Sequence, residues 1–134
     1  MNEKILRERI KLELAKGEES FKAAKILFDA GLFGGSVSDS YYAMFHCVIA
    51  ALITATDEPS THKGAVLLFN QHFIQTKVFE ERFGVMLGKA KEAREDSDYD
   101  VTVKFTKDEA GKRIEEAETF LERIKKYLKE KDLL

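Results

Sequence analysis

The sequence is poor in residues that mark several classes of protein. Its 134 residues include one cysteine, one proline and no tryptophan. A single cysteine, Cys47, excludes an internal disulfide and any metal site built from several cysteines. No run of about 18 apolar residues occurs, and the charged start MNEKILRERIKLELAKGEES lacks the apolar core of a signal peptide. These absences predict a cytoplasmic protein without a membrane span.

The sequence also lacks an excess of charge of one sign. The formal net charge is −2 and the pI is about 6.0, which excludes a bulk positive field toward nucleic acid or anionic membranes. Charged residues make up 34% and hydrophobic residues 44% of the chain, a balance that favours long helices with solvated outer faces over disorder. The length predicts one domain, residues 1–134, around one core.

Apolar residues recur at three- and four-residue steps, which predicts an all-α bundle of about five helices in an up-and-down arrangement. The first helix is expected to bend near Gly17. The first predicted helix ends at Gly31, and the second spans about Ser36 to Thr54. The third begins after Ser60 or Thr61, the fourth spans about Lys77 to Ser97, and the fifth begins at Thr106 or Asp108. The stretch DVTVKF alternates and predicts a short extended piece with no partner strand.

The second predicted helix is apolar on two sides. One face carries Tyr41, Phe45, Val48 and Leu52, which we expect inside the monomer. Such a helix is either central in the domain or packs one side on a second subunit. Small residues on it allow close approach of a neighbouring backbone. We expect one of them, Ala50, to be exposed, and a charge there to weaken self-association if that face is the interface.

The inner stripe of the fourth predicted helix ends in charge. It runs through Leu87 and Ala90 to Arg94 and then Asp98. Because a buried arginine needs a partner, we expect Arg94 and Asp98 to pair at i, i+4, with Tyr99 as a polar-tipped anchor. The simplest interpretation is that these residues tie the helix end to its neighbours.

Three stretches, SVSDSYYAMFHCVIAALI, THKGAVLLFNQHF and LGKAKEAREDSDYD, resemble the HEPN family, the higher eukaryote and prokaryote nucleotide-binding domains. The resemblance is to short stand-alone prokaryotic members. It implies a five-helix bundle that is commonly a homodimer, often made beside a minimal nucleotidyltransferase as a toxin and antitoxin pair. In related pairs the nucleotidyltransferase modifies a tyrosine near the motif, which makes Tyr99 the candidate acceptor here.

Many HEPN proteins are metal-independent ribonucleases whose signature is an arginine followed after four to six residues by histidine. Arg94 matches the arginine, but Tyr99, Asp100 and Val101 occupy the histidine window. Neither a carboxylate nor a phenol of ordinary pKa replaces an imidazole near pH 7. We therefore predict a non-catalytic module that binds a nucleotide, or is the partner subunit of a nucleotidyltransferase, through Arg94, Asp98 and Tyr99.

Two alternatives remain at this point. The chain is a ribonuclease toxin with an altered site, in which a histidine of another helix supplies the missing imidazole: His46, which lies among the aromatic residues Tyr41 and Phe45, His62 near a helix start, or His72. Otherwise it is a helical interaction protein whose polar cleft is only structural. No metal or cofactor is expected, because the histidines are widely spaced and GLFGGS lacks the lysine and strand of a phosphate loop.

Overall fold

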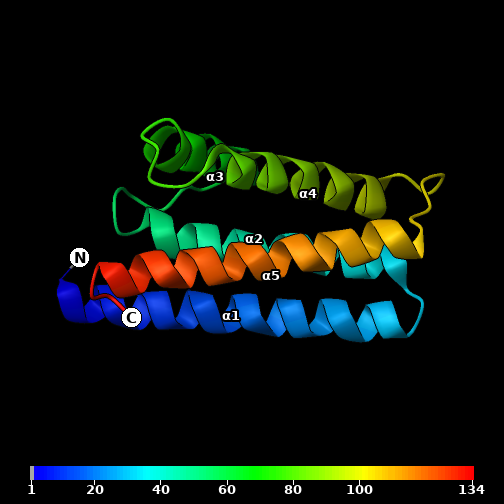
Figure 1. Ribbon diagram of the computed structural model, residues 1–134, viewed down its shortest axis with the longest axis horizontal. Coiled ribbons are helices and arrows are strands. Elements are labelled where there is room, and N and C mark those ends of the chain that lie inside the picture. Colours follow the sequence, from blue (N-terminus) through cyan, green and yellow to red (C-terminus); the bar gives the residue numbers. More distant parts are fainter. Residues whose placement is uncertain (1) are drawn as a thin grey trace.

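Helices make up the regular structure of residues 2–134, the part of the chain that the computed structural model describes. No strand occurs in that part, so the all-α prediction is confirmed. The four long helices alternate in direction along the bundle (Figure 1), which matches the expected up-and-down arrangement. The elements are α1 (Glu3–Asp29), α2 (Phe33–Leu52), α3 (His62–Phe69), a π-helical turn η1 (Asn70–Ile74), α4 (Glu81–Tyr99) and α5 (Lys107–Glu130).

Three of these helices are capped at their N-terminus by a polar side chain. The side-chain oxygens of Asn2, Thr61 and Thr106 each accept a backbone N–H from the first turn of α1, α3 and α5. This satisfies a donor that the helix itself leaves free. At the other end of α1, Gly31 has φ 77°, a left-handed conformation that glycine adopts without strain and that ends the helix.

The second helix begins at Phe33, three residues earlier than predicted. The stretch GLFGGS was expected to separate the first two helices. In the structure Gly34 is helical and lies so close to α4 that a Cβ there would be 2.9 Å from Ser97 Oγ. Its lack of a side chain therefore serves close packing between helices, which overrides its low helix propensity.

Gly17 is a second glycine whose role differs from the prediction. The first helix continues through it without a break. A Cβ on Gly17 would lie 3.1 Å from the carbonyl oxygen of Ala43 and 3.4 Å from Cys47 Sγ. The small residues of α2 thus receive the backbone of α1 within the same chain.

Two further boundaries differ from the predictions. The fourth helix begins at Glu81, because Lys77 has φ 64° and cannot continue a right-handed helix. The stretch DVTVKF forms a turn and irregular chain. There, the backbone N–H and the hydroxyl of Thr102 both donate to Asp100 Oδ1, at 3.0 and 2.6 Å. This Asx-type turn competes with an extended conformation.

The second helix is the central element, as predicted. Twelve of its 20 residues are buried, and it packs on α1, α4 and α5. Tyr41, Val48 and Leu52 are fully buried, whereas Phe45 is only partly buried. Ala50 is also fully buried, so the expectation that it is exposed for an interface was wrong. Neighbours inside the chain account for the two-sided apolar pattern.

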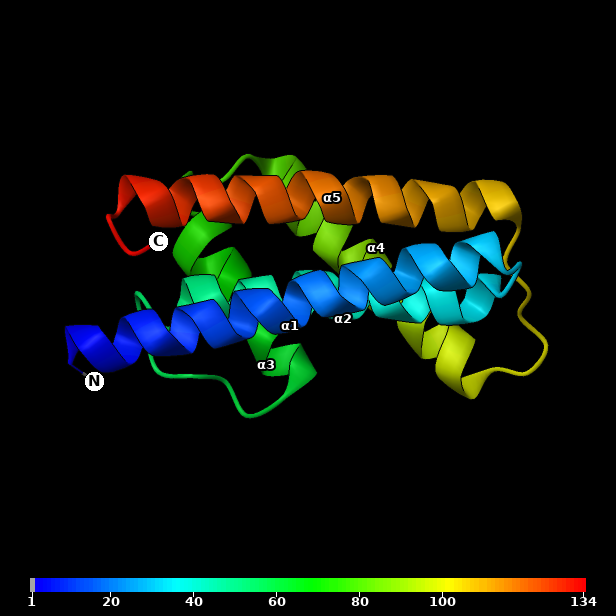
Figure 2. The same ribbon diagram turned by 90° about the horizontal axis from the view of Figure 1, so that it is seen from below.

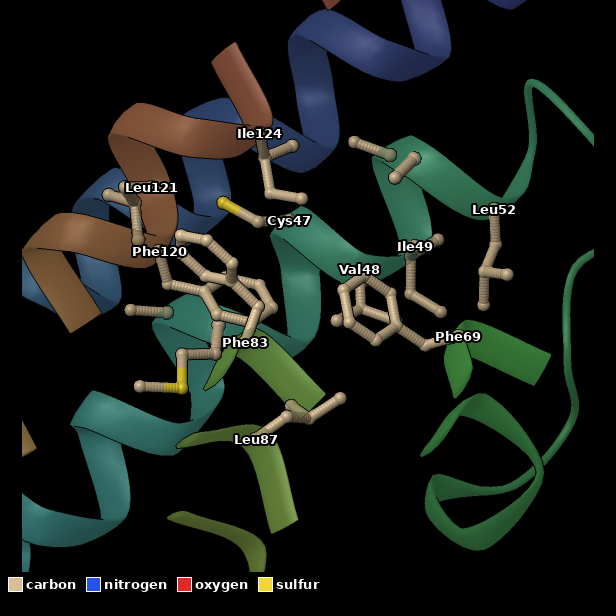
Figure 3. Close-up of a cluster of buried hydrophobic side chains, with 14 of the residues drawn as sticks. Cys47, Val48, Ile49, Leu52, Phe69, Phe83, Leu87, Phe120, Leu121 and Ile124 are labelled. Atoms are coloured by element: carbon tan, nitrogen blue, oxygen red, sulfur yellow. The ribbon is translucent and has the colours of Figure 1, made fainter. Parts of the chain in front are cut away.

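Aromatic rings fill the core on the side of α2 that faces α4 and α5. Figure 3 shows Val48 and Leu52 of α2 near Phe69, Phe83 and residues of α5. The Phe69 ring lies 5.6 Å from Phe79 and 5.5 Å from Phe120, and Phe83 lies 5.9 Å from Phe120. These contacts fix the rotation of α4 about its axis, and thereby the direction in which its inner stripe points.

The connection after α2 determines where α3 begins. Residues 53–61 turn back along the bundle, so that α3 begins beside the middle of α2 and not at its end (Figure 2). This return places His62 against Tyr41, 21 positions earlier in the chain. Within residues 2–134 no helix combines the length and apolar character needed to cross a membrane.

Candidate functional site

Arg94 is the centre of a polar cluster on the inner face of α4. It is 9% exposed. Its Nη2 donates to Tyr42 Oη at 2.8 Å, and its Nε lies 3.3 Å from Asp98 Oδ2. The expected pair with Asp98 is therefore present. Nε has no well-aligned acceptor among the described residues, so a buried donor of the guanidinium is free for a further acceptor.

Aromatic rings surround the guanidinium on several sides. Its Cζ lies 5.8 Å from the ring centroid of Tyr41, 5.4 Å from that of Tyr42 and 5.7 Å from that of Tyr99. A cation within about 6 Å of an aromatic face is attracted by the ring quadrupole. The cluster thus holds the charge of Arg94 in place with little water around it.

Two polar residues of α2 complete the acidic edge of the cluster. Ser38 Oγ donates to Asp98 Oδ1 at 3.1 Å. The carboxyl of Asp39 has a raised pKa because it is partly buried and because Asp98 is close. The edge around Asp98 is therefore already rich in negative charge.

Tyr99 does not anchor the helix end, so that prediction was wrong. The residue is 75% exposed, because α4 ends at Tyr99 and the chain turns away at Asp100. Its ring still contacts the cluster, with the centroid 5.7 Å from Arg94 Cζ. Its hydroxyl is accessible from solvent, which leaves it open to chemistry as an acceptor.

His62 lies within the same cluster, at the first position of α3. Its Nδ1 is 2.8 Å from Tyr41 Oη, and its ring is 4.4 Å from that of Phe45. Burial raises the pKa of Tyr41, and burial followed by the charges of Arg94 and Lys91 lowers the pKa of His62. The protonated phenol is able to donate a hydrogen bond to Nδ1 of a neutral imidazole, and in that tautomer the ring hydrogen lies on Nε2.

His46 is engaged elsewhere. Its Nδ1 is 2.9 Å from Glu13 Oε2 of α1. The Phe45 ring is near both histidines, 5.6 Å from the His46 ring and 4.4 Å from the His62 ring. Arg9 joins Glu13 to Glu58 in the connection before α3. The His46 network fastens α1 to α2 and to that connection, apart from Arg94.

The structure thus brings Arg94, Asp98, Tyr99, Tyr41 and His62 together and separates His46 from them. Sequence reasoning missed Tyr42, Ser38 and Lys91. A usable signal was present, because Ser38, Tyr42 and His46 follow one another at four-residue steps and place polar tips along one line of an otherwise apolar helix.

The cluster has the properties of an anion site and few of a proton-transfer site. Arg94 offers a buried donor and a fixed charge. At the end of α4, Tyr99 and Asp100 provide no imidazole. His62 is the histidine next to Arg94. Residues 2–134 contain no group of three or more His, Cys, Asp or Glu side chains placed to hold a metal ion.

The fold and the cluster define a class of protein: a five-helix up-and-down domain with an arginine buried among tyrosines near the end of its fourth helix. A model of the HEPN domain matches residues 10–127. The chain belongs to the HEPN family, which confirms the resemblance inferred from its motifs.

Several relatives match across most of the chain. A protein of Methanocaldococcus jannaschii named "Putative toxin" is 40% identical over 127 residues, which cover 95% of this chain and 94% of the relative. A second protein of that organism with the same style of name is 34% identical over 138 residues, 100% of this chain and 94% of the relative. A UPF0332 protein of Archaeoglobus fulgidus is 30% identical over 118 residues, 88% of this chain and 94% of the relative.

Proposed function

We propose that this chain is a HEPN module of a toxin and antitoxin pair that does not cleave RNA efficiently. In this proposal it is the nucleotide-binding or partner subunit of a separately encoded minimal nucleotidyltransferase. The names of the two Methanocaldococcus relatives support the toxin side of the pair. The nucleotidyltransferase and the homodimer rest on the family resemblance.

One observation carries the proposal: Arg94 is held at 9% exposure by Tyr42 and Asp98, while the family's histidine position is filled by Tyr99, Asp100 and Val101. The guanidinium can bind a phosphate, but the end of α4 has no group that exchanges a proton readily near pH 7. Loss of a general acid or base commonly costs about 100- to 10,000-fold in rate. Binding without efficient cleavage follows.

Tyr99 is the proposed acceptor of a nucleotidyl group: the partner transfers it from a nucleoside triphosphate to the tyrosine oxygen, which loses its proton, and pyrophosphate leaves. Its exposure of 75% gives a second enzyme access to the hydroxyl. Arg94, with its guanidinium 5.7 Å from the ring, is placed to hold the phosphate of the incoming nucleotide.

The test combines RNA cleavage with partner binding. Purified protein is incubated with single-stranded RNA without metal, and is separately co-purified with a nucleotidyltransferase encoded beside its gene. We expect slow or undetectable cleavage, and a complex that Arg94→Ala weakens. Glu92→Ala is the matched control, because Glu92 is exposed on α4 outside the cluster. Rapid cleavage that disappears in Arg94→Ala would overturn the non-catalytic part.

A metal-independent ribonuclease with an altered site is the second candidate function. The observation that favours it is the position of His62, whose neutral imidazole is linked through Tyr41 to the Arg94 cluster. A ribonuclease of this kind would lose cleavage in both Arg94→Ala and His62→Ala. His46→Ala would keep it, because His46 is bound to Glu13.

Self-association is tested by light scattering at micromolar concentration, where we expect a dimer. Because the apolar faces of α2 are covered within one chain, the interface should involve other exposed surface. A scattering mass equal to one chain would contradict the homodimer and leave the binding proposal intact.

A further inference from the structure

We propose that Lys91, Arg94 and His62 form a recognition site for a phosphate monoester, such as the terminal phosphate of a nucleotide. This inference rests on the proposed function, since it names the chemical group that the Arg94 cluster binds. It adds two residues, Lys91 and His62, and a charge requirement for the ligand.

The first step is the pairing of the two cations on α4. Lys91 pairs with Glu95, and Arg94 pairs with Asp98, each four residues on. Because Lys91 and Arg94 are three residues apart, they lie on the same face of the helix. Each carboxylate is C-terminal to its cation, which is the weaker order for such a pair. Both pairs are therefore easily exchanged for a better anion.

The second step is the difference in exposure within each pair. The side chains of Lys91 and Arg94 are 22% and 11% exposed, whereas those of Glu95 and Asp98 are 44% and 32% exposed. The carboxylates are therefore nearer to water than the cations, although release of Asp98 also breaks its hydrogen bond from Ser38. Arg94 is held against α2 by Tyr42. Arg94 Nε also lacks a well-aligned acceptor. An anion that enters the site therefore displaces the two carboxylates and pairs with the two cations, which do not need to move.

The third step is the charge of the ligand. Two displaced carboxylates leave two positive charges, which a phosphate monoester dianion neutralises and a phosphodiester monoanion does not. A monoester has a second pKa of about 6 and carries close to two negative charges above neutral pH. The site thus discriminates by charge, because a singly charged anion replaces only one of the two carboxylates.

His62 supplies a directed donor. Its Nδ1 lies 2.8 Å from Tyr41 Oη, and we take the tautomer in which Nδ1 accepts from the phenol and Nε2–H is left for the ligand. The charged groups that act on the ring are Arg94 and Lys91, which lower its pKa, Glu95, which raises it, and His46, which lowers it. A neutral ring therefore donates to the phosphate at neutral pH, and the rings of Tyr42 and Phe45 flank it, 5.9 and 4.4 Å away.

Titration calorimetry of the full chain at pH 7.5 tests the site with four probes: adenosine 5′-monophosphate, its 3′,5′-cyclic diester, adenosine and inorganic phosphate. We expect the monoester to bind about 10-fold or more tightly than the cyclic diester, as one lost charge-assisted contact predicts. Adenosine should not bind measurably. If inorganic phosphate binds as tightly as the nucleotide, the site is assigned to free phosphate. If inorganic phosphate binds more weakly, the site is assigned to a phosphorylated nucleotide.

Variants test the residues. His62→Gln should weaken monoester binding about 10-fold, and Glu95→Gln should strengthen it, because it removes a competing carboxylate. Glu92→Gln is the matched control on the same helix and should bind as the wild type does. A merely structural role of the cluster would not produce tighter binding in Glu95→Gln.

Three results would overturn the inference: no binding of a monoester by the wild type, equal binding of the monoester and the cyclic diester, or unchanged binding in His62→Gln. In each case the nucleotidyltransferase complex is measured in parallel. If Arg94→Ala still weakens that complex, the proposed function stands and the phosphate assignment alone is wrong. If neither the complex nor the nucleotide depends on Arg94, both are wrong.

Discussion

The two ends of α4 lie against two aromatic clusters of opposite chemistry. Near its start, Phe83 joins a cluster made mainly of phenylalanine rings, which also contacts the Tyr127 ring and the guanidinium groups of Arg82 and Arg123. Near its end, Arg94 lies among tyrosines with hydroxyl groups that bind polar partners. One stripe of the same helix runs through both, since Phe83, Leu87, Ala90 and Arg94 are its buried residues.

The comparison separates stability from recognition. A phenylalanine cluster stabilises the fold in proportion to the apolar surface that it removes from water. A buried ion pair contributes little net stability, because desolvation of the charges offsets their attraction. A position that buries an arginine where a hydrophobic residue would fit is thus better explained by binding than by stability. The predictions below test that division, from the largest expected effect to the smallest.

Phe83→Ala should give the largest loss of stability, about 3 to 5 kcal/mol in the free energy of unfolding, because it opens a cavity in the phenylalanine cluster. Urea unfolding followed by circular dichroism measures the change. Val85→Ala on the same helix is the control, since Val85 is 50% exposed and should change the value by less than about 0.5 kcal/mol. A loss in Phe83→Ala no larger than in the control would mean that the two clusters do not differ as described.

Tyr42→Phe should cost about 1.5 to 3 kcal/mol, because it removes the acceptor for Arg94 Nη2, 2.8 Å away, and leaves a charged donor unpaired. The same unfolding measurement applies. If the loss is within error of zero, the guanidinium finds another acceptor, and Tyr42 is not needed to hold it.

Tyr41→Phe should cost less, about 0.5 to 1.5 kcal/mol, because the bond that it removes joins two neutral groups, the phenol and the His62 imidazole. The ratio between the two tyrosine variants is the sharper test. A greater loss in Tyr41→Phe than in Tyr42→Phe would show that His62, and not Arg94, is the main polar partner of the tyrosines.

The smallest effect concerns acid stability at the His46 network. Burial acts to raise the pKa of Glu13, but hydrogen bonds from His46 and Arg9 outweigh it and lower the pKa below its usual value. Such a carboxylate stabilises the fold above its unfolded pKa, about 4.3, and the contribution is lost as pH falls through the folded pKa. Glu13→Gln should therefore make stability between pH 7 and pH 3 less dependent on pH in urea titrations. An unchanged pH profile would contradict the assignment.

Much of the fold was predictable because it depends on local patterns. The two-sided apolar pattern of α2 predicted its central place, and Thr61 and Thr106 marked the starts of α3 and α5. The start of α2 was missed because it depends on contact with Ser97, 63 residues away from Gly34 in sequence. Close approach of two backbones is a tertiary property that no single segment encodes.

The candidate site divides in the same way. Arg94 and Asp98 are one helical turn apart, so their pair followed from spacing. The contact of His62 with Tyr41 depends on the return of residues 53–61 along the bundle (Figure 2), and spacing could not choose between His62 and His46. Tyr99 follows the buried stripe in the sequence, but it is exposed because α4 ends there.

The most direct test of the account is the variant Arg94→Met, measured for both unfolding and binding of adenosine 5′-monophosphate. Methionine keeps much of the apolar length, and Asp98, whose side chain is 32% exposed, can return to water. We expect stability to be kept or raised, as commonly follows when a buried charge is replaced by a hydrophobic residue, and nucleotide binding to be lost. A loss of more than about 3 kcal/mol in stability, with nucleotide binding equal to that of the wild type, would contradict the account and assign Arg94 to the structure alone.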